Sequence, residues 1–375
     1  MSIIKNILLI STEFPPGPGG IGNHAWNIAR QLDKQFSIDV LTISDYVTNK
    51  ECLEFDKKER FYIHRFERYG LPTLTYLIRI FQIIKHLTRQ EYSHCIVSGH
   101  FSLLMSTVIK SIKKNIKLVG IFHGDELLHT NIIMKKLLRF NLRKLDVMIP
   151  VSRYTDSFLP GKFANYGKKF IISNGVNLEQ FNNSNEKVIN VKLKGSPRLL
   201  TVGSITDRKG QINLINALPE LIKKYPLIHY HCVGLPLEKN RLKAKAVELN
   251  VMNYVTIHGF IPNHELSNIF NQTDVLIMLS QSNLKLYAEG FGIAILEANV
   301  FGVPALGSKN TGIEDAIIHK TTGILINPYS IDEIVQGIKD IIANRKKLSE
   351  NAINWAHEHS WDNISVKYIE AISCA

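Results

Sequence analysis

The sequence contains little cysteine and no long hydrophobic run. Its cysteines (Cys52, Cys95, Cys232 and Cys374) are scattered, and no CxxC pair or adjacent histidine predicts a disulfide framework or a zinc site. No apolar stretch approaches the roughly 20 residues that cross a bilayer. The opening segment, MSIIKNILLISTEF, lacks a small-residue cleavage site, so we interpret it as a buried strand and not as a signal peptide. These absences favour a cytoplasmic protein without a metal site.

Acidic residues are scarce relative to basic ones in the first half only. Residues 1–180 hold 25 Lys and Arg against 15 Asp and Glu, and residues 181–375 hold 20 against 18. The first half therefore carries most of the net charge of +12. Such an excess suits an anionic membrane, nucleic acid or an anionic substrate, or simply a soluble basic surface. Because the chain contains no DNA- or RNA-binding motif, we expect no nucleic-acid partner.

Hydrophobic periodicity predicts two α/β domains in tandem. Short runs rich in Val, Ile and Leu alternate with amphipathic segments, among them helices expected over 73–90 and 101–113 and a strand over 169–175. The alternation restarts at 197–205. The predicted parts are a domain over 1–182, a domain over 183–358, and a final helix in 359–375 that returns to the first domain. Each domain is expected to be a Rossmann-like, doubly wound parallel sheet, with ligands bound in the cleft between them.

A glycine loop follows the first predicted strand, in STEFPPGPGGIGNHAWNIARQL. Gly17, Gly19 and Gly22 form a formal GxGxxG, and Asp45 lies at about the distance that a dinucleotide-binding fingerprint requires. The intervening EFPP lengthens and stiffens the loop, which disfavours that interpretation. The alternative is a long loop over the cleft, in which Gly19 and Gly20 let an anionic group approach the start of the next helix.

Two stretches of the second half predict a binding site for a diphosphate. Arg208 and Lys209, in ITDRKGQ, follow the first strand of the second domain, where their charges could neutralise phosphates or simply be solvated in a turn. The second stretch, EGFGIAILEANVFGVP, is more specific. Its glycines lead into a helix expected to begin near Ile293, and the free amides of the first helical turn form a phosphate site.

Two glutamates bracket that stretch. Glu289 precedes the glycines and is expected to point into the cleft. Glu297 lies about one turn into the helix, where its carboxylate could accept hydrogen bonds from the vicinal hydroxyls of a ribose or pair with a neighbouring base. A further turn that contains Gly312, in SKNTGIED, starts another helix and could also hold phosphate.

With these residues in place, the chain resembles the retaining GT-B glycosyltransferases of family 4. The resemblance covers essentially the whole chain in order, and its most specific part is the pair Glu289 and Glu297 separated by seven residues. The other matching stretches are FPPGPGGIGNHAWNIA, FHGDE, VSRYT, ISNGVNLEQF, LLTVGSITDRKGQ, VTIHGFIP, GVPALGS with TGIEDAI, and GILINP.

The resemblance implies a role for each candidate residue. His123 of FHGDE would lie beside the transferred sugar, Glu289 would contact the sugar ring, and Lys209 with Arg208 would hold the diphosphate. Glu297 would bind the donor ribose. The remaining substrate-binding residues are Gly19, Gly20, Phe291, Gly292, Ile293 and Gly312. The implied activity is retaining transfer of a hexose from a nucleotide-diphosphate sugar, without a cofactor or metal, to a glycan or lipid-linked acceptor of surface polysaccharide or lipopolysaccharide.

One departure from the family pattern is Ser204, where many members carry an arginine. The departure leaves open a non-catalytic partner subunit with the same fold, although Glu289, Lys209 and His123 are intact. An NAD-dependent oxidoreductase is the other alternative, and it leaves these residues unexplained.

The first half, which the resemblance implies binds the acceptor, contains basic amphipathic segments. Residues 130–144 place Lys135, Lys136, Arg139 and Arg143 largely on one flank, and the segment around 73–90 mixes basic and large apolar residues. These patterns suit either ordinary surface helices or the surface of an anionic membrane. We therefore predict a cytoplasmic enzyme that associates peripherally with the inner face of the cytoplasmic membrane.

Overall fold

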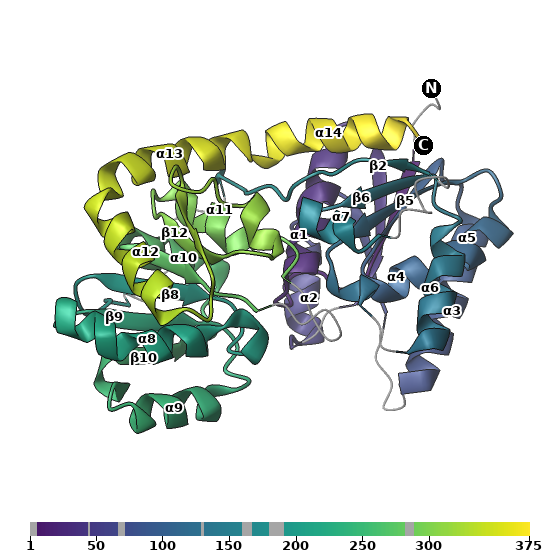
Figure 1. Ribbon diagram of the computed structural model, residues 1–375. Coiled ribbons are helices and arrows are strands. Elements are labelled where there is room, and N and C mark those ends of the chain that lie inside the picture. Colours follow the sequence, from purple (N-terminus) through teal and green to yellow (C-terminus); the bar gives the residue numbers. More distant parts are fainter. Residues whose placement is uncertain are drawn as a thin grey trace. The chain divides into compact units, whose positions relative to one another are not determined.

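The computed structural model describes residues 6–43, 46–66, 72–128, 131–159, 167–179, 191–281 and 289–375. The chain divides into two compact units (Figure 1). Unit 1 consists of Met1–Asn174 and Trp361–Ala375, and unit 2 of Gly175–Ser360. The predicted boundary at 182 lies outside the described residues, as does Asp45. Within the described ranges, no helix combines the length and the apolar character needed to cross a membrane.

Unit 1 is built on a parallel sheet with the strand order β3-β2-β1-β4-β5-β6-β7. Its strands are β1 (Asn6–Ser11), β2 (Ser37–Thr42), β3 (Tyr62–Arg65), β4 (His94–Ser98), β5 (Lys117–Phe122), β6 (Val147–Pro150) and β7 (Lys168–Lys169). Its helices are α1 (Gly20–Leu32), α2 (Asn49–Asp56), α3 (Pro72–Arg89), α4 (His100–Leu104), α5 (Ser106–Ile112), α6 (Ile132–Leu142), α7 (Arg153–Ser157) and α14 (Trp361–Ser373). The central strands are buried along almost their whole length because helices cover both faces.

The direction of the crossovers decides which helices share a face. The chain steps one way from β1 to β3 and the other way from β3 to β6, so right-handed connections place α1 and α2 on one face and α3 to α6 on the other. Buried residues of α3, α5 and α6 accordingly pack into one core cluster, including Leu87, Ile109 and Leu138. Helix α14 packs against α1.

Two predicted elements of unit 1 were wrong in extent. The helix expected over 101–113 is broken at Met105 into α4 and α5, and the Ser106 hydroxyl donates to the carbonyl of Leu103 (2.8 Å) and so competes with the helical bond pattern. The strand expected over 169–175 is reduced to β7. Pro150 ends the neighbouring strand β6 and has no N–H with which to continue the ladder.

Unit 2 repeats the arrangement with the strand order β10-β9-β8-β11-β12-β13. Its strands are β8 (Arg198–Val202), β9 (His229–Val233), β10 (Val255–Gly259), β11 (Val275–Met278), β12 (Ala305–Ser308) and β13 (Gly323–Ile326). Its helices are α8 (Gln211–Lys224), α9 (Lys239–Glu248), α10 (Asn263–Gln272), α11 (Ile293–Val300), α12 (Ile331–Ala343) and α13 (Arg345–Glu358), with short 3-10 turns η4 (Asp207–Lys209) and η6 (Gly312–Asp315). Both units thus have the doubly wound Rossmann-like order, which confirms the predicted fold class.

Candidate functional site

The basic turn of unit 2 lies at the carboxyl end of β8. Strand β8 ends at Val202, and the 3-10 turn η4 then presents Arg208 and Lys209. The Lys209 ammonium donates to the Glu289 carboxylate over 2.7 Å, and the Arg208 guanidinium reaches the same carboxylate oxygen at 3.5 Å. The fold therefore brings together two stretches that are 80 residues apart in sequence. Such proximity is necessary if both stretches bind the same ligand.

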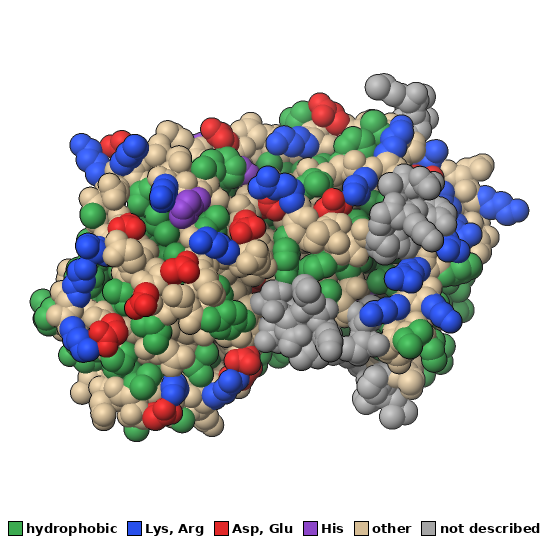
Figure 2. Space-filling model, in the orientation of Figure 1, with side chains coloured by type: hydrophobic (Ala, Val, Ile, Leu, Met, Phe, Trp, Pro, Cys, Tyr) green, Lys and Arg blue, Asp and Glu red, His purple; other side chains and the backbone are tan. Residues whose placement is uncertain are grey.

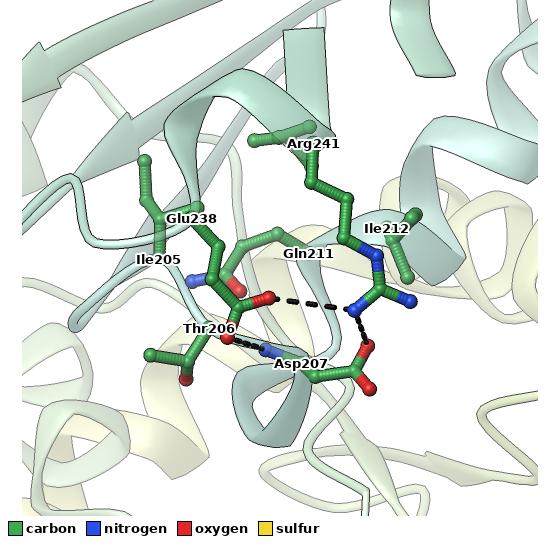
Figure 3. A pocket seen from close by; sticks show the side chains of 8 residues that line it. Ile205, Thr206, Asp207, Gln211, Ile212, Glu238 and Arg241 are labelled. Carbon is green, nitrogen blue, oxygen red and sulfur yellow. Dashed lines mark hydrogen bonds and ion pairs between the residues drawn. The ribbon is translucent and has the colours of Figure 1, made fainter. Parts of the chain in front are cut away.

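The other side of this turn is anchored to helix α9. Figure 3 shows the side chain of Asp207 pointing toward Arg241, and the two residues form an ion pair of 2.8 Å. The Glu238 carboxylate accepts the backbone N–H of Asp207 (3.1 Å) and also lies 3.4 Å from the Arg241 guanidinium. Together with the bond from the Gln281 N–H to the Arg208 carbonyl (2.7 Å), these contacts fix the turn that carries the two cations.

The carboxylate of Glu289 is buried, with 7% of the residue exposed. Burial by itself would raise its pKa, but the charges of Lys209 and Arg208, with hydrogen bonds from Lys209 and from the Ser280 hydroxyl (3.4 Å), hold the pKa below its usual value. Glu289 is therefore ionised at neutral pH. Its charge is balanced by Lys209 and Arg208, the cations that we predict to bind the donor diphosphate.

The glycine loop that follows Glu289 leads directly into helix α11, which begins at Ile293 as predicted. Gly292 adopts a left-handed conformation (φ 90°), which favours glycine, and no side chain of the described residues caps the first turn of α11. Phe291 is buried and anchors the loop. The uncapped amides at the start of the helix, beside Lys209 and Glu289, form the kind of environment that binds phosphate.

Gly312 packs against the backbone of the glycine loop, a structural role that we did not predict from the sequence. Its backbone N–H donates to the carbonyl of Glu289 (2.8 Å), and a Cβ at this position would lie 2.0 Å from the carbonyl oxygen of Gly290. The turn η6 therefore supports the loop that begins at Glu289. Only glycine at position 312 allows this close approach of the two backbones.

Glu297 is half-buried on helix α11, and burial raises its pKa to about 7. Within the described part of the chain, Glu297 has no hydrogen-bond or ion-pair partner, so the pairing with a neighbouring base that we considered is not found there. A carboxylate whose acceptor oxygens are unused suits the predicted ribose contact.

The candidate residues of unit 1 lie at the carboxyl edge of its sheet. Helix α1 begins at Gly20, directly after Gly19, and its first turn contains no acidic residue and no side-chain cap among the described residues. A Cβ at Gly19 would lie 2.1 Å from a carboxylate oxygen of Glu13, so a larger residue here would displace the flexible Glu13 side chain. The uncapped helix start is the phosphate-binding feature that we predict here.

His123 directly follows strand β5 and meets the last residue of the neighbouring strand β4. Its Nε2 lies 2.9 Å from the Ser98 hydroxyl, because the carboxyl ends of adjacent parallel strands meet at one edge. Its backbone N–H donates to the buried carboxylate of Glu126. Burial lowers the pKa of His123 to about 4, and burial raises the pKa of Glu126 to about 7. The imidazole is therefore neutral at physiological pH, and Ser98 fixes its orientation.

A buried histidine of helix α1, which the sequence did not reveal as a site residue, packs against His123. The His24 ring of α1 contacts the His123 ring edge to face, with 5.0 Å between centroids. Its Nε2 lies 2.8 Å from the hydroxyl of Tyr368 on α14, and its Nδ1 is buried without a partner among the described residues. The C-terminal helix thus supports the packing behind His123 across 344 residues of sequence. The only sequence signal was the position of His24 just after the glycine loop.

Ser204, the departure from the family pattern, lies in the segment between β8 and η4. Its carbonyl accepts a hydrogen bond from the Gln211 side chain (3.0 Å). Because serine carries no charge, position 204 supplies no cation to a diphosphate. The cations after β8 that face Glu289 are Arg208 and Lys209.

Two family models match this chain, one over each unit. The model described as Glycosyltransferase Family 4 matches residues 18–180. The model described as Glycosyl transferases group 1 matches residues 182–358. Together they span nearly the whole chain and include every predicted site residue.

Full-length relatives and solved structures agree with these matches. A GDP-mannose-dependent alpha-(1-6)-phosphatidylinositol monomannoside mannosyltransferase of Mycolicibacterium smegmatis is 25% identical over 386 residues, which cover 98% of each chain. The Anabaena protein HepE, solved with UDP and glucose, superposes with a TM-score of 0.77 at 18% identity over 99% of this chain and 100% of that one. Sucrose-phosphate synthase of Thermosynechococcus elongatus gives a TM-score of 0.76 at 17% identity over 99% and 100%. The chain therefore belongs to the group 1, family 4 glycosyltransferases with the GT-B fold.

Proposed function

We propose that this protein is a retaining glycosyltransferase that moves a hexose from a nucleotide-diphosphate sugar to a glycan acceptor, without a metal. The observation that carries the proposal is the convergence of Lys209, Arg208 and Glu289 at the uncapped start of α11. Two cations and free helix amides around a single anionic locus fit a diphosphate, and the buried carboxylate fits the hydroxyls of a sugar.

Lys209 and Glu289 can act together on a bound donor. An ammonium has three N–H donors, and the 2.7 Å bond to Glu289 uses one of them, so two donors are left for phosphate oxygens. The bond to Glu289 also orients the lysine before the donor arrives. As the bond between the anomeric carbon and the phosphate oxygen breaks, new negative charge develops on the diphosphate, where Lys209, Arg208 and the α11 amides stabilise it.

Retention follows in this proposal from attack on the leaving-group face of the sugar. The acceptor oxygen forms the new bond to the anomeric carbon, and the acceptor proton passes to the departing phosphate oxygen. Neutral His123, held by Ser98, would lie beside the sugar and hydrogen-bond to a hydroxyl group. Glu289 is a poor nucleophile here, because its carboxylate is already bound by Lys209, Arg208 and Ser280.

We propose a lipid-linked glycan of surface polysaccharide or lipopolysaccharide as the acceptor, and the inner face of the cytoplasmic membrane as the location. The M. smegmatis relative acts on a phosphatidylinositol mannoside, which supports a lipid-linked acceptor. The net charge of +12, concentrated in the first half, supports an anionic surface. All four cysteines are free thiols, which is consistent with a reducing compartment.

A thermal-shift panel with UDP-, GDP-, ADP- and TDP-sugars tests donor binding, and GDP-mannose is the first candidate because the relative uses it. We expect the sugars of one nucleotide to stabilise the protein. If none of the nucleotide sugars raises the melting temperature, the proposed transferase activity is refuted. Transfer is then measured with the stabilising donor in EDTA, and loss of activity would refute metal independence. The anomeric configuration of the product, determined by NMR, tests retention.

Glu289→Ala and Lys209→Ala should each abolish transfer while the circular dichroism spectrum stays unchanged. Lys223→Ala is the matched control, because Lys223 forms an ion pair of the same length, 2.7 Å, on the surface of the same unit. Full transfer activity in either site variant would refute the site assignment. Donor binding without any transfer to lipid-linked glycans would instead favour the non-catalytic partner subunit.

A further inference from the structure

The N-terminal half of helix α3 exposes large hydrophobic residues and buries polar ones. Leu74, Leu77 and Phe81 are 42%, 65% and 64% exposed, whereas Thr75 and Arg79 are only 8% and 6% exposed. The three apolar residues are spaced three and four apart and therefore form one outward stripe. A surface helix of a soluble protein normally places such a stripe against the core. The outer face of α3 is thus built to contact something apolar.

Helix α6 has an outer face of the same kind. Ile132 and Ile133 are 69% and 76% exposed, and Leu137 and Phe140 are 45% and 50% exposed. The buried residues of α6 that pack toward the sheet are Leu138, Asn141 and Leu142. The exposed residues therefore lie on the opposite side of the helix, away from the core.

The two helices form one surface. Both cover the same face of the sheet, where their buried residues join one core cluster. The short helix α4 connects them, because its Phe101 lies against Tyr76 of α3 (5.5 Å between centroids) and α4 also packs against α6. We call this the α3–α6 surface. Its large apolar residues are Leu74, Tyr76, Leu77, Phe81, Ile132, Ile133, Leu137 and Phe140.

Basic residues border the α3–α6 surface, and acidic ones are absent from both helices. The sequences PTLTYLIRIFQIIKHLTR and IIMKKLLRFNL contain lysine and arginine but neither aspartate nor glutamate. The exposed cations are Lys85, Arg89, Lys135, Lys136, Arg139, Arg143 and Lys144. The Lys144 ammonium lies 5.5 Å from the centre of the Phe140 ring. Figure 2 shows Lys and Arg side chains next to exposed hydrophobic ones on the part of unit 1 where Figure 1 labels these helices.

We propose that the α3–α6 surface docks on an anionic lipid bilayer, with its apolar side chains inserted among the acyl chains. An apolar stripe bordered by cations complements a negatively charged membrane surface in both respects. A second copy of the chain would bring two basic surfaces together, and like charges oppose that pairing. The surface is also more apolar than nucleic acid needs, since phosphate contacts require cations and not exposed Leu and Ile.

The location of this surface relates it to the predicted site in the same unit. Helix α3 follows β3 and α6 follows β5, so the first residues of both helices lie toward the carboxyl edge of the sheet, where His123 and Ser98 lie. Docking would therefore hold this edge close to the lipid headgroups, where a lipid-linked acceptor presents its glycan. This consequence depends on the proposed function, whereas docking itself does not.

Flotation with vesicles tests the docking without donor or acceptor. The full chain is mixed with vesicles of phosphatidylcholine alone or of phosphatidylcholine with about 30 mol% of the anionic lipid phosphatidylglycerol. We expect binding to the anionic vesicles that weakens as salt is raised, and little binding to the neutral ones. Leu77→Ser and Ile133→Ser should each weaken binding about tenfold, because each removes one inserted apolar side chain.

The matched control is Leu53→Ser. Leu53 is 61% exposed, close to the 65% of Leu77, but it lies on α2 on the opposite face of the sheet. A second readout separates insertion from simple adsorption: Phe81→Trp should give a blue-shifted fluorescence that brominated lipids quench, whereas Tyr62→Trp should not. Thermal melts of all variants exclude unfolding as the cause of weaker binding.

Three results would overturn the proposal. The first is binding to anionic vesicles that Leu53→Ser weakens as much as Leu77→Ser does. The second is no binding to either vesicle. The third is a concentration-dependent dimer in light scattering that Leu77→Ser dissociates, which would assign the surface to a second copy of the chain. None of these results requires turnover, so the docking can fail while the proposed transferase activity stands.

Discussion

Replacing Lys209 by methionine should destabilise unit 2 by about 3 kcal/mol, the range expected when one partner of a buried ion pair is removed. In the intact protein the Lys209 side chain is 14% exposed and that of Glu289 is 9% exposed, and their charged atoms are 2.7 Å apart. Methionine has a similar length but no charge, so the variant leaves the Glu289 carboxylate buried. Arg208 at 3.5 Å and Ser280 at 3.4 Å can compensate only in part.

A double-mutant cycle with Glu289→Gln separates the ion pair from the loss of packing. Glutamine removes the buried charge, so Lys209→Met should cost much less in the Glu289→Gln background than in the wild type. We expect a coupling free energy of about 2 kcal/mol or more between the two positions. The surface pair of Lys223 and Glu220 has the same distance, 2.7 Å, but side chains 70% and 53% exposed, and Lys223→Met should cost at most about 0.5 kcal/mol.

The cost of Lys209→Met should also depend on pH. In the wild type the pKa of Glu289 is lowered below 4.5, so its ionised form contributes stability above that pH and loses the contribution as the pH falls through the folded pKa. Without Lys209, burial dominates and raises the pKa of Glu289, so the folded variant takes up a proton more readily than its unfolded state. The difference in stability between wild type and variant should therefore be largest at neutral pH and shrink toward pH 4.

Native-state hydrogen exchange of the amides in β8 and β11 measures these free energies for unit 2 separately from unit 1. The cycle is measured at pH 7 and again near pH 5. A cost of Lys209→Met below about 1 kcal/mol, equal to that of Lys223→Met and unchanged by pH, would refute the reasoning. Such a result would mean that solvent reaches Glu289 and that its charge needs no partner.

Three further predictions test other parts of the molecule. His123→Gln should lower kcat about a hundredfold, because the variant loses the positioned imidazole that we propose to hydrogen-bond to the sugar. Burial lowers the pKa of His123 to about 4, so the wild-type pH–rate profile should show loss of neutral His123 only below about pH 5. A fall centred near pH 6.5 would contradict this burial. Gly312→Ala should weaken donor binding by about a hundredfold in calorimetry, because a Cβ 2.0 Å from a backbone carbonyl oxygen forces the glycine loop to move. An unchanged affinity would show that the position of the loop does not depend on the turn η6. Tyr368→Phe should destabilise unit 1 by about 1–2 kcal/mol in hydrogen-exchange measurements on α1, because His24 loses its hydrogen-bond partner. The control is Tyr329→Phe, at a residue that is 63% exposed. An equal cost for the two variants would contradict a stabilising bond between His24 and Tyr368.

Local patterns predicted the elements whose signals are contained in a short stretch of sequence. The helix that begins at Ile293 was predicted from the glycines before it and the apolar run after it, and the structure confirms its start. The two doubly wound sheets followed from the alternation of buried strands and amphipathic helices. The break at Met105 was missed because the 101–113 segment keeps its helical periodicity across both short helices.

The surfaces of α3 and α6 show how far amphipathic patterns can be interpreted. The sequence revealed a mixture of basic and apolar residues at helical spacing, but not which side faces the core. The structure shows Arg79 buried with its guanidinium 4.0 Å from the centre of the Phe101 ring, while Leu77 and Phe81 face outward. Orientation depends on what the sheet and the neighbouring helices offer, and no single helix encodes it.

The sequence by itself determined the fold class, the family and the two short stretches that carry the predicted donor site, because these depend on periodicity and on glycine and charge at fixed spacing. Tertiary structure alone decided which charges meet. Glu289 is paired with Lys209 over 80 residues of sequence, whereas Glu297, only eight residues further along, has no partner among the described residues and a pKa raised to about 7. Burial and the distance to a cation set a carboxylate's pKa, and both are properties of the folded chain.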